Sequence, residues 1–261
     1  APQPVSGQDL ANHFGITRTA VWKHIQSLKK MGYGIEAYTK KGYVLVSVPN
    51  KLLPEEISRH LHTRFIGRNM AYEDVIPSTN DLLKKMALQG APDGTVCVAE
   101  EQSVGKGRLA RGWFSPYGKG LWFSLLLKPT FLPQEAPKMT LLAAVAVVRA
   151  VRELCGVKAE IKWPNDILLE GRKLVGILTE MSAEFGHINY LVVGIGINVC
   201  VPQSMVPEAS GVCRFHPMMW QKNQRIGWPS WLRSSIIWRL AMRRSSRKAL
   251  APFSMNGAAI P

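Results

Sequence analysis

Residues 162–181 read KWPNDILLEGRKLVGILTEM, and this stretch decides how the larger part of the chain folds. A strand leads into it and breaks at Pro164, because proline donates no backbone hydrogen bond and restricts the residue before it. Asn165 and Asp166 then fall in a turn. Two apolar runs follow with Glu-Gly-Arg between them, which predicts a β-hairpin.

The same stretch carries charges that the hairpin brings to one place. We expect Lys162, Asp166 and Lys173 to converge on one mouth, with Lys173 entering the return strand. A carboxylate there suits Mg²⁺, and an amine suits a phosphate or a carboxylate. Taken alone, however, Pro-Asn-Asp is an ordinary turn, and a lysine in a strand is usually only solvated.

Further strands and one long helix surround this hairpin. Apolar runs bounded by turn residues predict a mixed sheet packed on one or two helices, which is an α+β domain. The strands are expected within residues 94–102, 120–128, 159–169, 173–181 and 189–199, and the long helix within 136–154.

Residues 1–48 have the pattern of a separate small domain. Ser6 and Thr17 each precede an apolar helical periodicity, so they are predicted to cap two short helices, with a turn at Gly15 between them. A hairpin with a basic tip follows, which completes the order of a winged helix-turn-helix. The apolar faces of the two helices are expected to hold Leu10, Ala11, Phe14, Ala20, Val21, Ile25 and Leu28.

The charges of this small domain favour DNA binding over an ordinary helical domain with a solvated surface. Lysines of the second helix and of the hairpin tip suit phosphates, whereas Arg18 and Thr19 are left for base edges. The expected DNA-binding residues are Thr17, Arg18, Thr19, Lys23, Lys40 and Lys41.

Charge and cysteine usage narrow the class of protein. The net charge of +15 is typical of proteins that bind nucleic acid. Cys97, Cys155, Cys200 and Cys213 are too far apart for a paired zinc site or a compact disulfide framework, which indicates free thiols in a cytoplasmic protein. No apolar run is long enough for a membrane-spanning helix. Because a helical pattern starts almost at Ala1, we expect part of the N-terminus to be missing.

A second basic motif, GKGRLARGW, occupies residues 105–113. Glycine weakens helices and strands by roughly 0.5–1 kcal/mol relative to alanine, so two glycines here indicate a backbone that bends or approaches a ligand closely. Arg108 and Arg111 carry planar forks that suit phosphate or carboxylate. The motif is neither a Walker A sequence nor a Rossmann fingerprint. A solvated basic loop is the alternative.

Four segments occur together in an order and spacing that is similar to one family. They are PSTND (77–81), EEQSVGKGRLARGWFSP (100–116), KWPNDILLEGRKLVGILTEM (162–181) and GIGINV (194–199). Over residues 5 to about 200 the chain resembles the biotin protein ligases, specifically the bifunctional kind that also represses biotin synthesis. It departs from them at Lys106, where arginine is common, and at Ala110, where glycine is frequent.

This resemblance implies a fold and a division into domains. The catalytic domain would be a mixed-sheet, class II synthetase-like domain over residues 65–200, joined to the winged helix by a linker and connecting helix at 49–64. It would bind ATP, biotin and Mg²⁺. Its partners would be the biotin carboxyl-carrier domain of acetyl-CoA carboxylase, operator DNA and, with the adenylate bound, a second copy in a homodimer. A ligand shared by the ligase and the repressor couples vitamin supply to transcription.

The implied reaction has two steps. The carboxylate of biotin attacks the α-phosphate of ATP, which gives biotinyl-adenylate and pyrophosphate, and a lysine of the carrier then attacks the mixed anhydride. Both steps gather negative charge around one phosphorus, so positioned cations should dominate catalysis.

The resemblance also assigns roles to individual residues. The catalytic set is Lys173, Arg108, Arg111 and Asp166, with Asp166 also expected to work with Mg²⁺. The biotin set is Ser78, Thr79, Asn80, Gln102, Gly105, Lys106, Arg108, Lys173 and Gly176. The ATP set is Arg108, Arg111, Lys162, Asn165, Asp166, Lys173 and Asn198. Trp113, Leu178 and Ile197 are candidates for an apolar wall, although core packing is the favoured role of each.

Two other functions remain open. Lipoate ligases share the catalytic fold and the reaction type, although the glycine-arginine motif and Lys-Trp-Pro-Asn-Asp favour biotin. A repressor that only senses the adenylate is the other, and Lys173 and Asp166 argue against it because sensing needs no phosphate chemistry.

The composition changes near residue 202. Residues 201–261 contain nine Lys and Arg but one acid, Glu208, and helical periodicity becomes hard to find. We expect the residues from about 202 onward to be translated in the wrong reading frame, in place of the rest of the catalytic domain and a C-terminal β-barrel. Ligase activity would then be weak or absent. A basic tail that binds nucleic acid is the alternative.

Overall fold

The computed structural model describes residues 3–61, 63–199, 201 and 205 of the chain. The chain divides into two compact units, Ala1–Lys51 and Leu52–Pro261. Apart from Met205, the segment for which we expect a shifted reading frame lies outside the described residues.

The smaller unit has the predicted order of helix, turn, helix and hairpin. The side-chain oxygen of Ser6 accepts a hydrogen bond from the backbone N–H of Asp9 at 2.9 Å, and that of Thr17 accepts one from Ala20 at 3.1 Å, so both residues cap helices. Gly15 adopts the left-handed conformation between them. The elements are α1 (Gly7–Phe14), α2 (Arg18–Lys30), β1 (Gly34–Tyr38) and β2 (Gly42–Ser47).

The core of this unit is smaller than the sequence pattern predicts. Ala11, Val21 and Ile25 are buried together. Phe14, expected on the apolar face of α1, is 63% exposed, and its ring contacts only the edge of the neighbouring His13 among ring contacts of the described residues. Three residues along a helix turn a side chain by about 60° from its starting direction, which takes Phe14 off the narrow face of Ala11.

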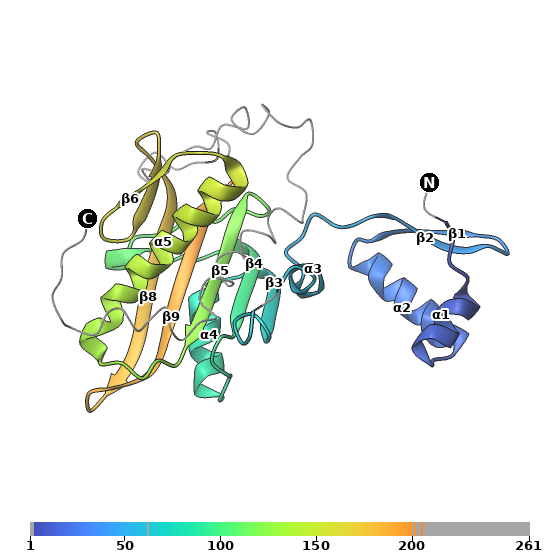
Figure 1. The fold of residues 1–261 in the computed structure, drawn as a ribbon, viewed down its shortest axis with the longest axis horizontal. Helices are drawn as coiled ribbons and strands as arrows, with labels where there is room; N and C mark the ends of the chain where they lie inside the picture. Colours follow the sequence, from blue (N-terminus) through green and yellow to red (C-terminus); the bar gives the residue numbers. More distant parts are fainter. Residues whose placement is uncertain (1–2, 62, 200, 202–204, 206–261) are drawn as a thin grey trace. The chain divides into compact units, whose positions relative to one another are not determined.

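The larger unit is a seven-stranded mixed sheet with helices (Figure 1). The strand order is β3-β4-β5-β9-β8-β7-β6, in which β3 and β4 are parallel and all other neighbours are antiparallel. The α+β architecture is as predicted. The elements are α3 (Pro54–Ser58), β3 (Met70–Ile76), α4 (Thr79–Leu88), β4 (Val96–Gln102), η1 (Arg108–Ala110), β5 (Gly120–Leu127), η2 (Pro133–Glu135), α5 (Ala136–Cys155), β6 (Ala159–Lys162), β7 (Asp166–Leu169), β8 (Arg172–Glu184) and β9 (His187–Asn198).

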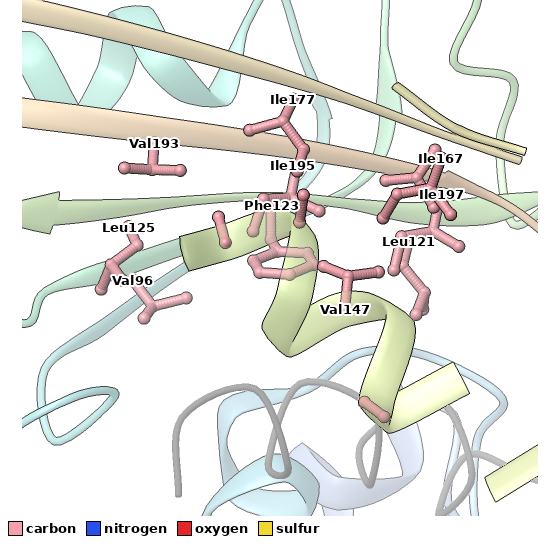
Figure 2. Packing of buried hydrophobic residues seen from close by; sticks show 14 of the residues in the cluster. Val96, Leu121, Phe123, Leu125, Val147, Ile167, Ile177, Val193, Ile195 and Ile197 are labelled. Atoms are coloured by element: carbon pink, nitrogen blue, oxygen red, sulfur yellow. The ribbon is translucent and has the colours of Figure 1, made fainter. Parts of the chain in front are cut away.

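The two faces of the sheet have different tasks. Every second residue of β5 and β9 points to one face of the sheet, and these residues, such as Phe123 and Ile195, pack under α5. Figure 2 shows Phe123 beside Val147. The alternate residues face α4, where Leu126 packs against Leu83. Successive side chains of a strand point to opposite faces, so one face is a core and the other is available for a site.

The segment 49–64, expected to be a linker with a connecting helix, belongs mostly to the larger unit. The boundary between the units falls between Lys51 and Leu52. Leu52, Ile57 and Leu61 are buried in the core of the sheet, with exposed fractions of 0, 0 and 6%. Three large apolar side chains at this spacing are better placed in a core than in a linker.

The cysteines of the described part are free thiols, as expected. Burial raises the pKa of Cys97 and of Cys155 to about 12. Cys200 and Cys213 lie outside the described residues. Of the helices that the structure describes, none is long and apolar enough to cross a membrane.

Candidate active site

One face of the sheet is hollowed next to α4. The empty volume there, its open mouth included, is about 470 Å³. The residues that line this cavity are Ser78, Thr79, Asn80, Gln102, Lys106, Gly107, Arg108, Trp113, Phe123, Asn165, Lys173, Gly176, Ile177, Leu178, Gly194, Ile195 and Gly196.

Three glycines of β8 and β9 form the floor of the cavity. Gly176 and Gly196 are paired across the two strands, and a Cβ on either would lie within 3 Å of the Trp113 side chain, at 2.8 and 2.3 Å. A Cβ on Gly194 would lie 2.3 Å from Oδ1 of Asn80. The glycine floor of Gly176, Gly194 and Gly196 therefore lets a tryptophan ring and an amide lie directly on the sheet.

The beginning of α4 supplies the polar end of the cavity. Ser78 is the N-cap residue, but its side chain makes no cap hydrogen bond. Instead the backbone N–H of Thr79 donates to Oε1 of Gln102 at 2.9 Å. Nε2 of Gln102 donates to Oγ of Ser115 at 3.0 Å. A helix start leaves unpaired N–H groups, and here a strand side chain satisfies one of them.

A buried hydrogen-bonded chain continues behind Thr79. Its hydroxyl lies 2.6 Å from Oγ of Ser124, which donates to Oδ1 of Asn80 at 2.5 Å. Nδ2 of Asn80 donates to Oε2 of Glu180 at 2.7 Å. Lys84 forms an ion pair with the other oxygen of Glu180 at 3.0 Å. Thr79, Asn80 and Ser124 are each at most 4% exposed, so their hydrogen bonds are protected from water.

The glycine-arginine loop, residues 105–113, folds back on itself beside the cavity. The carbonyl of Gly105 accepts from the N–H of Trp113 at 2.8 Å, and a Cβ on Gly105 would lie 2.2 Å from the carbonyl oxygen of Trp113. The N–H of Gly107 donates to the carbonyl of Arg111 at 2.7 Å. Glycine is needed at 105 because the two arms of the loop come too close for a side chain.

Two side chains tie this loop to its surroundings. Lys106 pairs with Asp81 of α4 at 2.5 Å, and Nη1 of Arg108 donates to Oδ1 of Asn165 at 3.2 Å. Burial by itself would raise the pKa of the Asp81 carboxyl, but hydrogen bonds from Lys106 and Lys84 outweigh it and hold the pKa below its ordinary value. The loop is therefore anchored on both sides of the cavity mouth.

Lys173 supplies a cation over the glycine floor. Its Nζ lies 2.8 Å from Oδ1 of Asp166 and 5.1 Å from the centre of the Trp113 ring. Oδ1 of Asp166 is buried and makes no directed hydrogen bond, so the contact with Lys173 is an ion pair that depends on distance and charge. Within the described residues, no three His, Cys, Asp or Glu side chains gather in a way that would hold a metal ion.

Most of the predicted site residues lie around this one cavity. Lys173 enters the return strand of a hairpin, as expected. Of the two residues expected in the preceding turn, Asn165 lies there, whereas Asp166 begins β7. The predicted residues that line the cavity are Ser78, Thr79, Asn80, Gln102, Lys106, Arg108, Trp113, Asn165, Lys173, Gly176 and Leu178.

The other predicted residues do not line the cavity. Arg111 and Lys162 are exposed, and Lys162 is the cross-strand partner of Asp166. Ile197, a candidate for an apolar wall, is 2% exposed and packs in the core, because it occupies a β9 position that faces α5. The remaining three act through neighbours. Gly105 shapes the loop, Asp166 pairs with Lys173, and Nδ2 of Asn198 donates to the carbonyl of Lys173 at 3.4 Å.

The smaller unit has its own hollowed surface. It lies between the beginning of α2 and the tip of the hairpin, and Arg18, Thr19, Lys40 and Lys41 are among the residues that line it. Of the other two predicted DNA-binding residues, Thr17 caps α2 and Lys23 is exposed outside this hollow. The arrangement joins a helix and a basic hairpin on one surface, as a DNA-binding unit requires.

Comparison with known proteins accounts for both units. Residues 72–198 match the biotin/lipoate A/B protein ligase family, and residues 1–44 match a helix-turn-helix domain. The chain is thus similar to the biotin protein ligases. It is 48% identical over 195 residues to the bifunctional ligase/repressor BirA of Bacillus subtilis (strain 168), and 35% identical over 196 residues to that of Escherichia coli (strain K12).

These alignments cover 75% of this chain but only 60% of each of the two relatives. Among solved structures, the biotin protein ligase from Aquifex aeolicus in complex with biotin and ATP is similar at a TM-score of 0.52 and 28% identity, over 67% of this chain and 68% of that one.

Several residues of the site could not be identified from the sequence alone. The glycines at 194 and 196 were quoted only as part of a motif, although alternate glycines in a strand indicate that something packs closely on one face. Ser124 and Glu180 are ordinary residues of apolar strands, and no local signal marks them. Their role follows from the register that places them beside α4.

Proposed function

We propose that this chain activates biotin with ATP to biotinyl-5′-AMP and transfers the biotinyl group to a lysine of a biotin carboxyl-carrier domain. The observation that carries the proposal is the polarity of the cavity. The neutral hydrogen-bonding groups Thr79 and Gln102 lie together at the start of α4, whereas the cations of Arg108 and Lys173 lie beside Asn165 and Asp166. The third lining cation, Lys106, is paired with Asp81 of α4. A ligand with an uncharged polar head, an apolar body and a carboxylate tail matches this distribution.

The middle of the cavity suits the apolar body of such a ligand. Trp113 lies on the glycine floor, and Leu178 adds an aliphatic side chain on the same face of β8. Apolar walls with few polar groups orient a small molecule and exclude water. The carboxylate of biotin would then extend toward Lys173.

The cationic end fits the first chemical step. A carboxylate oxygen of biotin bonds to the α-phosphorus of ATP while the bond to the β-phosphate breaks and pyrophosphate leaves. Lys173 is positioned to stabilise the charge that gathers on the α-phosphate, and Arg108 can bind a phosphate with its fork. The ion pair with Asp166 holds the amine of Lys173 over the floor until an anion arrives.

The second step needs an entry for the carrier lysine. Its amine bonds to the acyl carbon, AMP leaves with the electron pair of the broken bond, and the amine releases a proton. Mg²⁺ would neutralise phosphate charge. Since magnesium is usually held by phosphates and one or two carboxylates, Asp166 fits as a single protein ligand.

The smaller unit supports a second activity. We propose that its hollow between α2 and the hairpin binds operator DNA and that the adenylate-bound chain acts as a homodimeric repressor. Arg18 and Thr19 lie where base edges would be read, and Lys40 and Lys41 lie where phosphates would pass. The similarity to bifunctional ligase/repressors supports the combination.

The test is pyrophosphate release by the purified full chain with ATP and either biotin or lipoate. We expect release with biotin alone, and a loss of about 100-fold or more in Lys173→Ala, because one preorganised charge contact is removed. Lys158→Ala, an exposed lysine before β6, is the matched control and should be unchanged. Pyrophosphate release with lipoate would instead indicate a lipoate ligase. Binding of synthetic biotinyl-adenylate without pyrophosphate release from ATP and biotin would instead indicate a repressor that only senses the adenylate.

A further inference from the structure

The buried row of hydrogen bonds behind Thr79 has a donor-to-acceptor direction that is fixed at one end, by Glu180. A carboxylate accepts hydrogen bonds and cannot donate them, so Oε2 of Glu180 must receive the bond from Asn80. Lys84 forms an ion pair with the other oxygen of Glu180 at 3.0 Å. The amide of Asn80 is therefore held with Nδ2 toward Glu180 and Oδ1 toward Ser124.

This orientation determines where two hydroxyl protons lie. Oδ1 of Asn80 is an acceptor, so Ser124 gives its single proton to Asn80 at 2.5 Å. The 2.6 Å contact between Thr79 and Ser124 then needs the proton of Thr79. Oε1 of Gln102 also lies 3.0 Å from the Thr79 hydroxyl, but it already accepts the backbone N–H of Thr79 at 2.9 Å. The single hydroxyl proton of Thr79 cannot serve both neighbours. The shorter contact, with Ser124, has no other proton available, so the Thr79 proton lies there.

Thr79 therefore faces the cavity as an acceptor. Its hydroxyl proton points into the protein, and the lone pairs that remain point away from Ser124. A ligand group that meets Oγ1 of Thr79 gains a hydrogen bond only if it donates one. The four groups from Glu180 to Thr79 convert a fixed negative charge on β8 into a fixed polarity at the head of the cavity.

We propose that Glu180, Asn80 and Ser124 are positioning residues that make the site selective for a head group with an N–H donor. This inference rests on the proposed function, since the cyclic urea of biotin carries two N–H groups whereas the dithiolane of lipoate carries none. Glu180 lies outside the cavity lining and acts through Asn80. A buried donor or acceptor that stays unpaired costs more than a lost contact, so polarity at this position discriminates strongly.

Replacing Glu180 by glutamine removes the fixed direction and keeps the size of the side chain. The glutamine amide can donate to Oδ1 of Asn80 as well as accept from Nδ2, so the whole chain can reverse and Thr79 can turn its proton toward the cavity. Ser124→Ala acts by another route, because Thr79 loses the acceptor of its shorter contact and its proton is left with Gln102, 3.0 Å away, and the cavity. Glu184→Gln, an exposed glutamate that ends β8, is the matched control.

The experiment measures dissociation constants of the full chain by calorimetry for biotin and for the two N-methylated biotins, each of which lacks one N–H. The methyl group has the same bulk in every variant, so a change in the affinity ratio reports polarity. We expect the preference for biotin over one methylated form to fall by about three- to tenfold in Glu180→Gln and Ser124→Ala, and to stay constant in Glu184→Gln. Melting curves identify any variant that is unfolded.

The outcomes separate this inference from the proposed function. Wild-type binding of biotin with an unchanged preference in both folded variants would overturn the inference and leave the function standing. A changed preference without pyrophosphate release from biotin would support the inference and overturn the ligase activity. A wild-type chain that binds no biotin would overturn both.

Discussion

Gly196→Ala is the sharpest test of the cavity floor. A Cβ there would lie 2.3 Å from Nε1 and 2.6 Å from Cε2 of Trp113, whereas ordinary contacts begin at 3.4 Å. The ring must move by about 1 Å, because a close-packed interior leaves it nowhere to compress. Overpacking of this kind costs about 1–3 kcal/mol. The displaced ring also moves away from its place under Lys173.

The same displacement should weaken ligand binding and catalysis. A shift of about 1 Å in a positioned group can reduce turnover by roughly 100-fold. We expect a lower melting temperature and a higher dissociation constant for biotin, both measured on the full chain. Gly112→Ala in the same loop is the control, since a Cβ there would meet nothing within 4 Å.

A second substitution checks the cause. Trp113→Phe removes Nε1, which is buried and has no hydrogen-bond partner among the described residues, so its loss sacrifices no such contact. In the Gly196→Ala background this smaller ring should restore part of the stability. If Gly196→Ala alone melts at the wild-type temperature and binds biotin equally well, the ring does not lie on the floor as described.

Three further outcomes follow from single contacts. Arg108→Gly should release the adenylate faster in a stopped-flow chase, because a charge-assisted contact of about 1.5–3 kcal/mol is lost; an unchanged release rate would exclude this role. Replacing Lys40 and Lys41 by alanine should flatten the salt dependence of DNA binding by about one unit per phosphate contact, and an unchanged slope would place the contacts elsewhere. Since the pKa of Asp81 is lowered, its stabilising effect is complete above the ordinary value of 3.8 and is lost as the pH falls below it. Chemical denaturation of Asp81→Asn should therefore show a smaller loss of stability on acidification than wild type, and parallel curves would contradict the contact.

The elements that sequence predicted well are those that local rules determine. Ser6 and Thr17 cap helices because each precedes an amphipathic run by one position, and that signal needs no tertiary structure. The hairpin after Pro164 has the same local origin, with Glu170 and Gly171 in the left-handed conformation at its tip. Such patterns fix an element before its neighbours are known.

The elements that sequence missed depend on partners far along the chain. β3 and α4 were not predicted, although Ser78 before an apolar helical pattern is a usable N-cap signal. Ile197 was a candidate for both the wall and the core, because a strand buried on both faces reads as a continuous apolar run and hides its orientation. The register with β5 decides it.

Along β9, residues that stabilise the core alternate with glycines that shape the site. Val193, Ile195 and Ile197 pack in the core beneath α5, whereas the intervening Gly194 and Gly196 carry Asn80 and Trp113. Truncating one of the three apolar residues should therefore lower the melting temperature first, and enlarging one of the two glycines should disturb the ligand first. A protein that needs an aromatic wall against a sheet has to leave side chains out of the sheet, and the Gly-Ile-Gly-Ile sequence does this without opening the core on the other face. The glycine motif is thus explained by packing on one face of the strand, and its value for recognising the family comes from that physical requirement.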